Sequence, residues 1–196
     1  MSSEKAYYEN PENVANYSKF NPSHDGSLLI DALTPFLPDG STVLELGIGP
    51  GKDLALLSEH YSVTGSDFSH TFLERYREQH PAADLLLLDA LTLDTDRRFD
   101  GIFSNKVLMH MTADELAESF ARQHALLNDD GVILHSFWYG EGEQSFGELT
   151  LRRHNEQDLA ALLEPHFDIL ALERHAKMQE GDSIYVVARR KSVPDA

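Results

Sequence analysis

Short apolar runs alternate with amphipathic segments along most of the chain. Buried strands are predicted at 42–46, 62–66, 85–88, 99–104 and 131–137, and two closing strands at 167–172 and 184–188. Between the strands, apolar side chains recur at helical spacing, as in 52–60. Repeated strand and helix steps with a terminal strand pair predict an α/β fold, a three-layer sandwich around a mostly parallel sheet.

Polar residues mark where several helices begin. Ser69 and Asn155 can each cap a helix, and Thr112-Ala113-Asp114-Glu115 has the pattern of a capping box. The polar stretch 140–147 predicts a long loop after the fifth strand.

Two helices are predicted ahead of the first strand. Asn10-Pro11-Glu12 has the polar cap and first-turn proline of a helix start, and this helix ends before Pro22. A second amphipathic stretch, 25–37, is broken by Pro38-Asp39-Gly40-Ser41.

Length and composition fit one domain. The chain has 196 residues, of which 41% are hydrophobic, enough for one globular core. We expect a single domain over 1–196, with an N-terminal helical lid at 1–40 and the core at 41–191. No uncharged stretch approaches the ~18 residues of a membrane helix. Because cysteine is also absent, we expect a soluble, cytoplasmic protein.

Charge narrows the range of partners. With 33 acidic and 16 basic residues the net charge is −17, which repels phosphate backbones and anionic lipid surfaces. Neither a nucleic acid nor a membrane is therefore an expected partner. Since the chain has no cysteine and no closely spaced histidine pair, no metal site is predicted. The oligomeric state stays open.

A glycine-rich turn joins the first buried strand to the following helix. In Gly47-Ile48-Gly49-Pro50-Gly51, small residues let a ligand approach the backbone, and free N–H groups at the helix start point toward it. A purely structural turn is the alternative, but three glycines would then cost backbone entropy without a gain. A nicotinamide dinucleotide pattern needs a third glycine where Lys52 stands.

Val43-Leu44-Glu45-Leu46-Gly47-Ile48-Gly49-Pro50-Gly51 closely resembles the first motif of the class I S-adenosylmethionine-dependent methyltransferases. Asp67, twenty residues past the first glycine, stands where that family has its ribose-binding acid. The resemblance continues at Asp89-Ala90-Leu91, at 99–105 and at 127–131. It implies a Rossmann-like sheet of seven strands with the last strand antiparallel, and S-adenosylmethionine as cofactor.

The resemblance also implies a role for each matched residue. Asp67 would accept hydrogen bonds from both ribose hydroxyls, because a carboxylate offers two acceptor oxygens. Glu45 would either hold the glycine loop or meet the cofactor's ammonium group indirectly, and Tyr17 would either close the site or only pack its helix. The glycines would lie under the methionine part, Phe68, Asp89, Ala90 and Leu91 around the adenine, and the Asn105 carbonyl beside the sulfonium. The candidate cofactor-binding residues are thus Tyr17, Glu45, Gly47, Gly49, Gly51, Asp67, Phe68, Asp89, Ala90, Leu91 and Asn105.

Methyl transfer is an in-line displacement at an activated carbon, so the protein mainly aligns the reactants and excludes water. His110, after the fourth strand, and His135, near the end of the fifth, are the candidate catalytic bases, because neutral imidazole can accept a proton near pH 7. Each could instead be a hydrogen-bonded wall residue. The pair Arg152-Arg153 could meet a charged acceptor or simply lie at the surface.

The acceptor is narrowed by subtraction. Ser104-Asn105-Lys106-Val107 lacks the Asn/Asp-Pro-Pro-aromatic pattern that resembles nucleic-acid amino methylation. A small-molecule acceptor is therefore expected, with the methylated atom left open. Alternatives are a non-catalytic module that binds S-adenosylmethionine or S-adenosylhomocysteine, a protein methyltransferase and, less favoured, a nicotinamide-dependent oxidoreductase.

Overall fold

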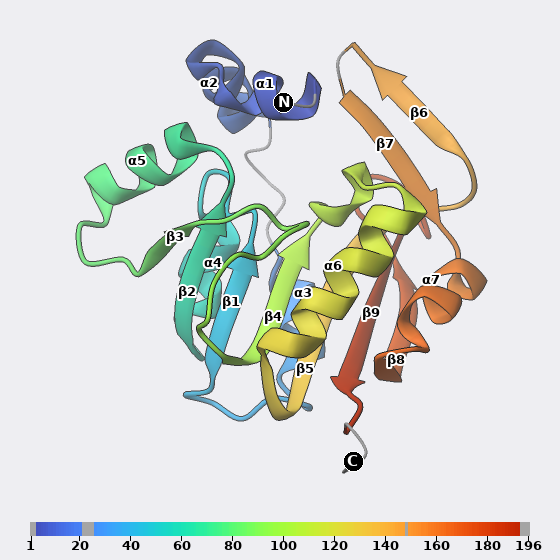
Figure 1. Ribbon diagram of the computed structural model, residues 1–196. Helices are drawn as coiled ribbons and strands as arrows, with labels where there is room; N and C mark the ends of the chain where they lie inside the picture. Colours follow the sequence, from blue (N-terminus) through green and yellow to red (C-terminus); the bar gives the residue numbers. More distant parts are fainter. Residues whose placement is uncertain (1–2, 21–25, 148, 193–196) are drawn as a thin grey trace.

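A computed structural model describes the backbone of residues 3–20, 26–147 and 149–192 (Figure 1). Within these ranges it describes the side chains of all residues except 3–5, 16–20 and 146. The elements follow the predicted alternation of strand and helix.

Seven strands form the main sheet, and all seven correspond to predicted runs. Their order is β3, β2, β1, β4, β5, β9, β8. The first five are parallel, whereas β9 is antiparallel to both β5 and β8, so the last strand of the chain is the antiparallel one, as predicted. The bounds are β1 Thr42–Leu46, β2 Ser62–Asp67, β3 Leu85–Leu87, β4 Phe99–Asn105, β5 Leu127–Tyr139, β8 Phe167–His175 and β9 Ser183–Arg190.

A hairpin stands where a loop was predicted. Strands β6 (Glu143–Phe146) and β7 (Leu149–His154) pair antiparallel, and β7 joins the end of β5 in parallel, so the complete sheet has nine strands. The prediction of a loop over 140–147 is wrong because a polar strand has no hydrophobic alternation to reveal it. Pairing with β7 supplies the order that composition does not indicate.

The helices begin largely where polar caps predicted them. Ser69 caps α5, Thr112 and Glu115 form the capping box of α6, and Asn155 caps α7. Helix α1 was not predicted, and α3 and α4 are shorter than expected. The bounds are α1 Ser3–Glu9, α2 Pro11–Phe20, α3 Ser27–Leu33, α4 Lys52–Leu57, α5 His70–Gln79, the 3-10 turn η1 Leu108–His110, α6 Ala113–Leu126 and α7 Glu156–Leu163.

Helices cover both faces of the sheet and produce three layers (Figure 1). Helices α6 and α7 pack on one face, and α3 with α4 on the other. Leu29, Ile30 and Leu33 of α3 belong to the same buried cluster as Val43 and Phe103 of the sheet. Although α3 lies within the predicted lid segment 1–40, it is therefore part of the core, and only α1 and α2 are placed as a cover.

Helices α1 and α2 lie beyond the carboxyl ends of the parallel strands, with α1 beside both α5 and β7 (Figure 1). Backbone carbonyls of this segment accept side-chain hydrogen bonds from the start of α5: Ser69 Oγ donates to Tyr8 O at 2.7 Å and Thr71 Oγ1 to Glu9 O at 3.3 Å. Arg75 also donates to Pro11 O at 3.1 Å. These contacts place α1 over the strand ends.

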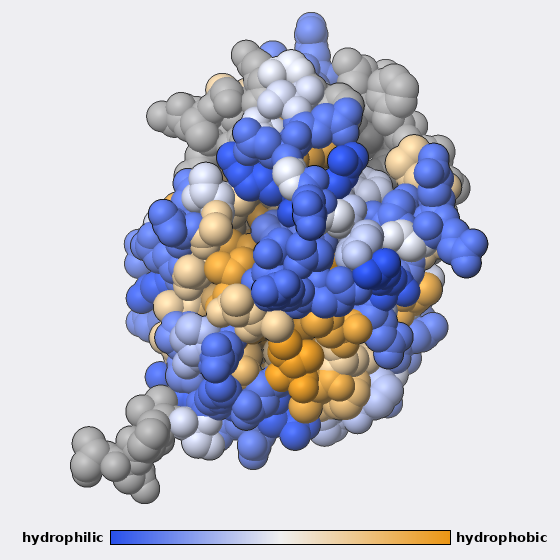
Figure 2. All heavy atoms as spheres, turned by 90° about the vertical axis from the view of Figure 1, so that its right-hand side faces the viewer, coloured by the Kyte–Doolittle hydropathy of each residue, from blue (hydrophilic) through white to orange (hydrophobic). Residues whose placement is uncertain are grey.

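The side formed by β6, β7, α7 and β8 is mostly hydrophilic, with hydrophobic side chains gathered in its lower half (Figure 2). Strand β8 ends the sheet there, pairing with β9, and its Ile169 is 39% exposed. In the part of the chain that the structure describes, no helix is both long and apolar enough to span a bilayer.

The packing of α3 gives a stability prediction. Leu33→Ala should lower the free energy of unfolding by about 2–5 kcal/mol, because Leu33 is fully buried and its loss leaves a cavity. Leu28→Ala on the same helix is the matched control, since Leu28 is 49% exposed and should change stability by no more than about 0.5 kcal/mol. Urea denaturation measures both. Equal effects in the two variants would mean that α3 is not packed on the sheet as described.

Candidate cofactor and acceptor site

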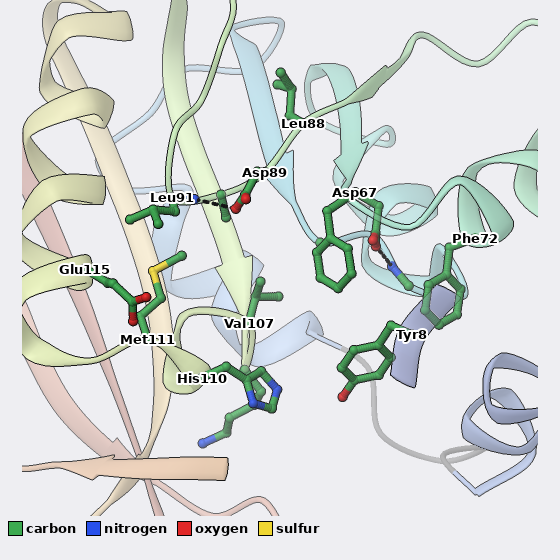
Figure 3. Close-up of a pocket in the computed structure, with 15 residues that line it drawn as sticks. Tyr8, Asp67, Phe72, Leu88, Asp89, Leu91, Val107, His110, Met111 and Glu115 are labelled. Atoms are coloured by element: carbon green, nitrogen blue, oxygen red, sulfur yellow. Dashed lines mark hydrogen bonds between the residues drawn. The ribbon is translucent and has the colours of Figure 1, made fainter. Parts of the chain in front are cut away.

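A cavity of about 230 Å³ opens at the carboxyl ends of β1, β2 and β4, under α1 (Figure 3). Ligands of open α/β sheets usually bind at this edge. Its lining comes from the glycine turn, the ends of β2 and β3, the segment after β4, and α1. The lining residues are Tyr8, Gly47, Gly49, Asp67, Phe68, Phe72, Leu88, Asp89, Ala90, Leu91, Lys106, Val107, His110, Met111 and Glu115.

The three glycines of the turn have different roles. Gly47 and Gly49 line the cavity with positive φ values of 70° and 48°, a region that favours glycine. A Cβ on Gly47 would also lie 2.6 Å from a methyl of Val107. Gly51 lies outside the lining: it starts α4 at a φ of 81°, and a Cβ there would lie 2.1 Å from the Tyr76 ring. Gly51 is thus required for packing rather than for approach to the cavity.

Asp67 ends β2 and is 5% exposed. Its Oδ2 accepts from Gly49 N at 3.0 Å and its Oδ1 from Ser69 N at 2.8 Å. Burial raises its pKa to about 6, and these backbone donors oppose the rise. Because each carboxylate oxygen has a second lone pair, Asp67 can still accept from two adjacent hydroxyls of a ligand. Its position and chemistry therefore fit the ribose of the implied cofactor.

The segment after β3 forms a second wall. Asp89, Ala90 and Leu91 line the cavity together, as the resemblance implies. Asp89 Oδ1 accepts from Leu91 N at 3.0 Å, and Ala90 O accepts from Ser119 Oγ at 2.7 Å. Leu91 N and Ala90 O are thus already hydrogen-bonded within the protein, so Leu91 N could donate to an adenine only after a rearrangement. Phe68 and Leu88 add an apolar surface suited to a flat ring.

Three other candidates lie outside the described lining or beyond description. Glu45 is 3% exposed and sits behind the glycine turn, where burial and the neighbouring Asp53 and Asp67 raise its pKa well above the usual range. Its Oε2 has no hydrogen-bond partner among the described residues. Asn105 is also outside the described lining, and its side chain donates to Asp53 at 2.8 Å. Tyr17 belongs to α2, but its side chain falls outside what the structure describes.

His135 is a core residue and does not line the cavity, which corrects its assignment as a candidate base. The ring is fully buried; Nε2 donates to Gln123 Oε1 at 2.7 Å and Nδ1 accepts from Ser104 Oγ at 2.8 Å. Burial lowers its pKa to about 3. A neutral ring with both nitrogens bonded inside the core cannot reach an acceptor.

His110, by contrast, lines the cavity. Its Nδ1 lies 2.9 Å from Thr150 O, and its ring meets the ring of Tyr8 edge to face at 6.1 Å (Figure 3). Tyr8 comes from α1 and His110 from η1, so segments far apart in the sequence form this end of the cavity.

Several lining residues had no sequence signal that marked them. They are Phe72, Lys106, Val107, Met111 and Glu115. Lys106 has a positive φ of 60°, and its Nζ donates to Phe137 O and to Ser183 Oγ and lies 4.2 Å from the Trp138 ring centre. Burial lowers the pKa of Lys106 to about 7. Phe137 and Ser183 are far from Lys106 in the sequence, so these contacts exist only in the folded chain.

The placement of His135 predicts a structural role. His135→Ala should lower the free energy of unfolding by about 2–4 kcal/mol, because it leaves a cavity and unpaired groups on Gln123 and Ser104. Affinity for S-adenosylhomocysteine should be unchanged. Denaturant titration measures the free energy of unfolding, and calorimetry measures the affinity. A large loss of affinity with unchanged stability would mean that His135 does contribute to the binding site.

Comparison with known proteins finds a methyltransferase domain in part of the chain. A family model described as a methyltransferase domain matches residues 43–131. The chain is 32% identical over 121 residues to a phosphatidylethanolamine N-methyltransferase of Cereibacter sphaeroides, covering 58% of this chain and 60% of the relative. It is 33% identical over 101 residues to a trans-aconitate 2-methyltransferase of Variovorax paradoxus (strain S110), covering 50% and 38%. The chain thus spans less than two thirds of the length of either relative.

Among solved structures, the fold is similar to that of a Burkholderia thailandensis 1,6-didemethyltoxoflavin-N1-methyltransferase with bound 1,6-didemethyltoxoflavin and S-adenosylhomocysteine. The TM-score is 0.79 at 24% identity, over 98% of this chain and 91% of that chain. The glycine turn and Asp67 lie within the matched residues 43–131, and both Gly49 and Asp67 line the cavity. Residues 43–131 thus match a methyltransferase domain, and the described fold is similar to that of an S-adenosylmethionine-dependent methyltransferase.

Proposed function

We propose that the protein transfers a methyl group from S-adenosylmethionine to a nitrogen atom of a small-molecule acceptor. One observation carries this proposal: a single cavity runs from the glycine turn and Asp67 to the facing rings of Tyr8 and His110 (Figure 3). We assign the first end of this cavity to the cofactor and the other end to the acceptor.

The first end suits the cofactor, which when bound supplies a methyl carbon activated by positive sulfur. Gly47 and Gly49 would lie under its methionine part, and Asp67 would accept from the ribose hydroxyls. Phe68, with the Asp89 segment, would hold the adenine. The buried Oε2 of Glu45 supports an indirect role toward the cofactor's ammonium group, because it has no partner among the described side chains.

At the other end, His110 is the candidate base. As an acceptor nitrogen forms its bond to the methyl carbon, its N–H proton would pass to the imidazole, and the carbon–sulfur bond would break. Tyr8 and Met111 would exclude water from this end. We restrict the lid proposal, made for residues 1–40, to α1 and α2, since Tyr8 on α1 forms part of the lining.

Charge favours a nitrogen acceptor over a carboxylate. The described lining contains three carboxylates, on Asp67, Asp89 and Glu115, but one lysine or arginine, Lys106. The Nζ of Lys106 is bonded to Phe137 and Ser183, and a pKa of about 7 leaves it only partly charged. An anionic acceptor such as trans-aconitate, named in one relative, would therefore meet one partly charged lysine among three carboxylates of the described lining. Nitrogen is the methylated atom in the names of the other relative and the similar structure.

The remaining alternatives have less support. A non-catalytic binding module would be favoured if Tyr17, Trp138 or His110 filled the acceptor end. Trp138 is not among the described lining residues, His110 is one of the residues around the cavity, and the Tyr17 side chain lies outside the described residues. Lys52 at the third-glycine position disfavours a nicotinamide cofactor. We retain the proposals of a cytoplasmic location and no nucleic-acid partner; the net charge of −17 supports the latter.

An acceptor panel tests the function. Formation of S-adenosylhomocysteine should be seen with planar nitrogen heterocycles or amines, and not with trans-aconitate or other carboxylic acids. In parallel, S-adenosylmethionine and S-adenosylhomocysteine should raise the melting temperature, whereas NAD should not. Methylation of carboxylates alone would overturn the choice of nitrogen, and stabilisation by NAD alone would overturn the cofactor.

With an acceptor from that panel, His110→Ala should lower kcat by about 10²–10⁴-fold, the usual contribution of a positioned base. Its affinity for S-adenosylhomocysteine, measured by calorimetry, should be unchanged. His80→Ala is the control, because His80 stacks on Tyr76 at the end of α5 and does not line the cavity. Equal turnover in the two variants would remove His110 from the reaction.

The raised pKa of Asp67 predicts how cofactor affinity depends on pH. Only the ionised carboxylate offers both oxygens as acceptors, so affinity for S-adenosylhomocysteine should fall as pH is lowered through the pKa of about 6. At neutral pH, Asp67→Asn should cost about 2–3 kcal/mol of binding free energy and remove this pH dependence. Asp39→Asn, at a side chain 81% exposed, is the control. A pH profile that survives in Asp67→Asn would contradict the assignment.

A further inference from the structure

Strand β7 contacts His110 at two points. His110 Nδ1 lies 2.9 Å from Thr150 O, and Arg152 NH1 donates to His110 O at 2.6 Å. The first contact holds the imidazole ring, and the second holds the backbone that carries it. Together, alternate residues of β7 fix both the orientation and the position of His110.

The contact with Thr150 also selects the tautomer. A backbone carbonyl can only accept, so His110 Nδ1 must carry the hydrogen for this bond to form. In the neutral ring, Nε2 is then the nitrogen with the lone pair. A proton acceptor at Nε2 is what the proposed reaction requires of His110.

The turn that carries His110 depends on outside support. The 3-10 turn η1 spans Leu108–His110 and is followed by the capping box of α6. Such a short turn has few internal hydrogen bonds to fix its backbone. Arg152 supplies a bond from the hairpin: its side chain is 24% exposed, and NH2 also lies 3.4 Å from Glu143 of β6. Arg152 therefore joins both strands of the hairpin to η1.

We propose that Arg152 is a positioning residue, which holds His110 so that Thr150 fixes its Nδ1–H tautomer and Nε2 accepts the acceptor's proton. This inference rests on the proposed function and assigns a task to the hairpin. Arg152 does not belong to the described cavity lining, so it acts through His110 and not on the ligand.

The neighbouring arginine provides a matched control. Arg153 is the next residue of β7, is exposed, and donates to Gln144 at 3.1 Å. Successive side chains of a strand point to opposite sides, so a substitution at Arg153 removes the same charge from the same strand without touching η1. Arg152→Lys adds a conservative variant, because lysine keeps a donor for His110 O but lacks the planar fork.

The first experiment records ¹⁵N spectra of histidine-labelled protein at about pH 8, where ordinary imidazoles are neutral. His110 is assigned among the ten histidines by its absence in His110→Gln. In the wild type and in Arg153→Ala, Nδ1 should show the shift of a protonated nitrogen and Nε2 that of an unprotonated nitrogen. In Arg152→Ala both should move toward averaged values, and Arg152→Lys should restore part of the difference.

The second experiment measures kinetics with an acceptor from the panel. Arg152→Ala should lower kcat by about 10- to 100-fold, the scale of a misplaced catalytic group, with KM for S-adenosylmethionine unchanged. Arg153→Ala should change neither. A wild-type ¹⁵N pattern in Arg152→Ala, or equal loss of kcat in both alanine variants, would overturn the proposal.

The two readouts separate this inference from the proposed function. The ¹⁵N spectra need no methyl acceptor. A failure to find any methylated compound would therefore count against the proposed function, while the spectra would still test the role of Arg152. If the melting curve shows that Arg152→Ala does not fold, Arg152→Lys decides the question. A wild-type tautomer of His110 with wild-type kcat would support a hydrogen-bond donor at position 152. An averaged tautomer with wild-type kcat would overturn the link between the His110 tautomer and the reaction.

Discussion

The Asp67 carboxylate is the contact on which the cofactor end of the cavity depends. Its oxygens accept from Gly49 N in the glycine turn and from Ser69 N at the start of α5. Ser69 in turn donates through its side chain to Tyr8 O on α1. Three segments from different parts of the chain are therefore linked through the buried Asp67. A shift of Asp67 would move the glycine turn and α1 together.

Holding this carboxylate in a buried place has a cost, which the raised pKa of Asp67 expresses. Backbone donors from Gly49 and Ser69 offset part of it. A ligand with two adjacent hydroxyls would add donors to the charged form and would lower the pKa again, because a hydrogen bond to the ionised group favours ionisation. Cofactor binding would then stabilise the junction between the glycine turn, α5 and α1. Binding and local order would thus be coupled through the Asp67 carboxylate.

Features with a local signal could be predicted from the sequence, and features made by distant contacts could not. The capping box at Thr112 involves neighbours in sequence, and so does the strand–glycine–helix step. The β6–β7 hairpin has no such clear signal: β6 is mostly polar, and Leu149 and Leu151 are the only hydrophobic residues of β7. Motif spacing also does not say which way a residue faces, which is why Glu45 and Gly51 match the family motif yet lie outside the described lining.

The two histidines singled out from the sequence show how far environment decides chemistry. His110 follows a central strand and His135 lies within one, and nothing in their local sequence shows which of them meets a cavity. His135 faces Gln123 and Ser104 in the core, where burial keeps it neutral and both nitrogens are occupied. His110 stands one turn beyond β4, where β7 can bond its Nδ1 and the cavity begins. A hairpin that was not predicted from the sequence thus helps to set the surroundings of His110, whereas His135 is surrounded by the core.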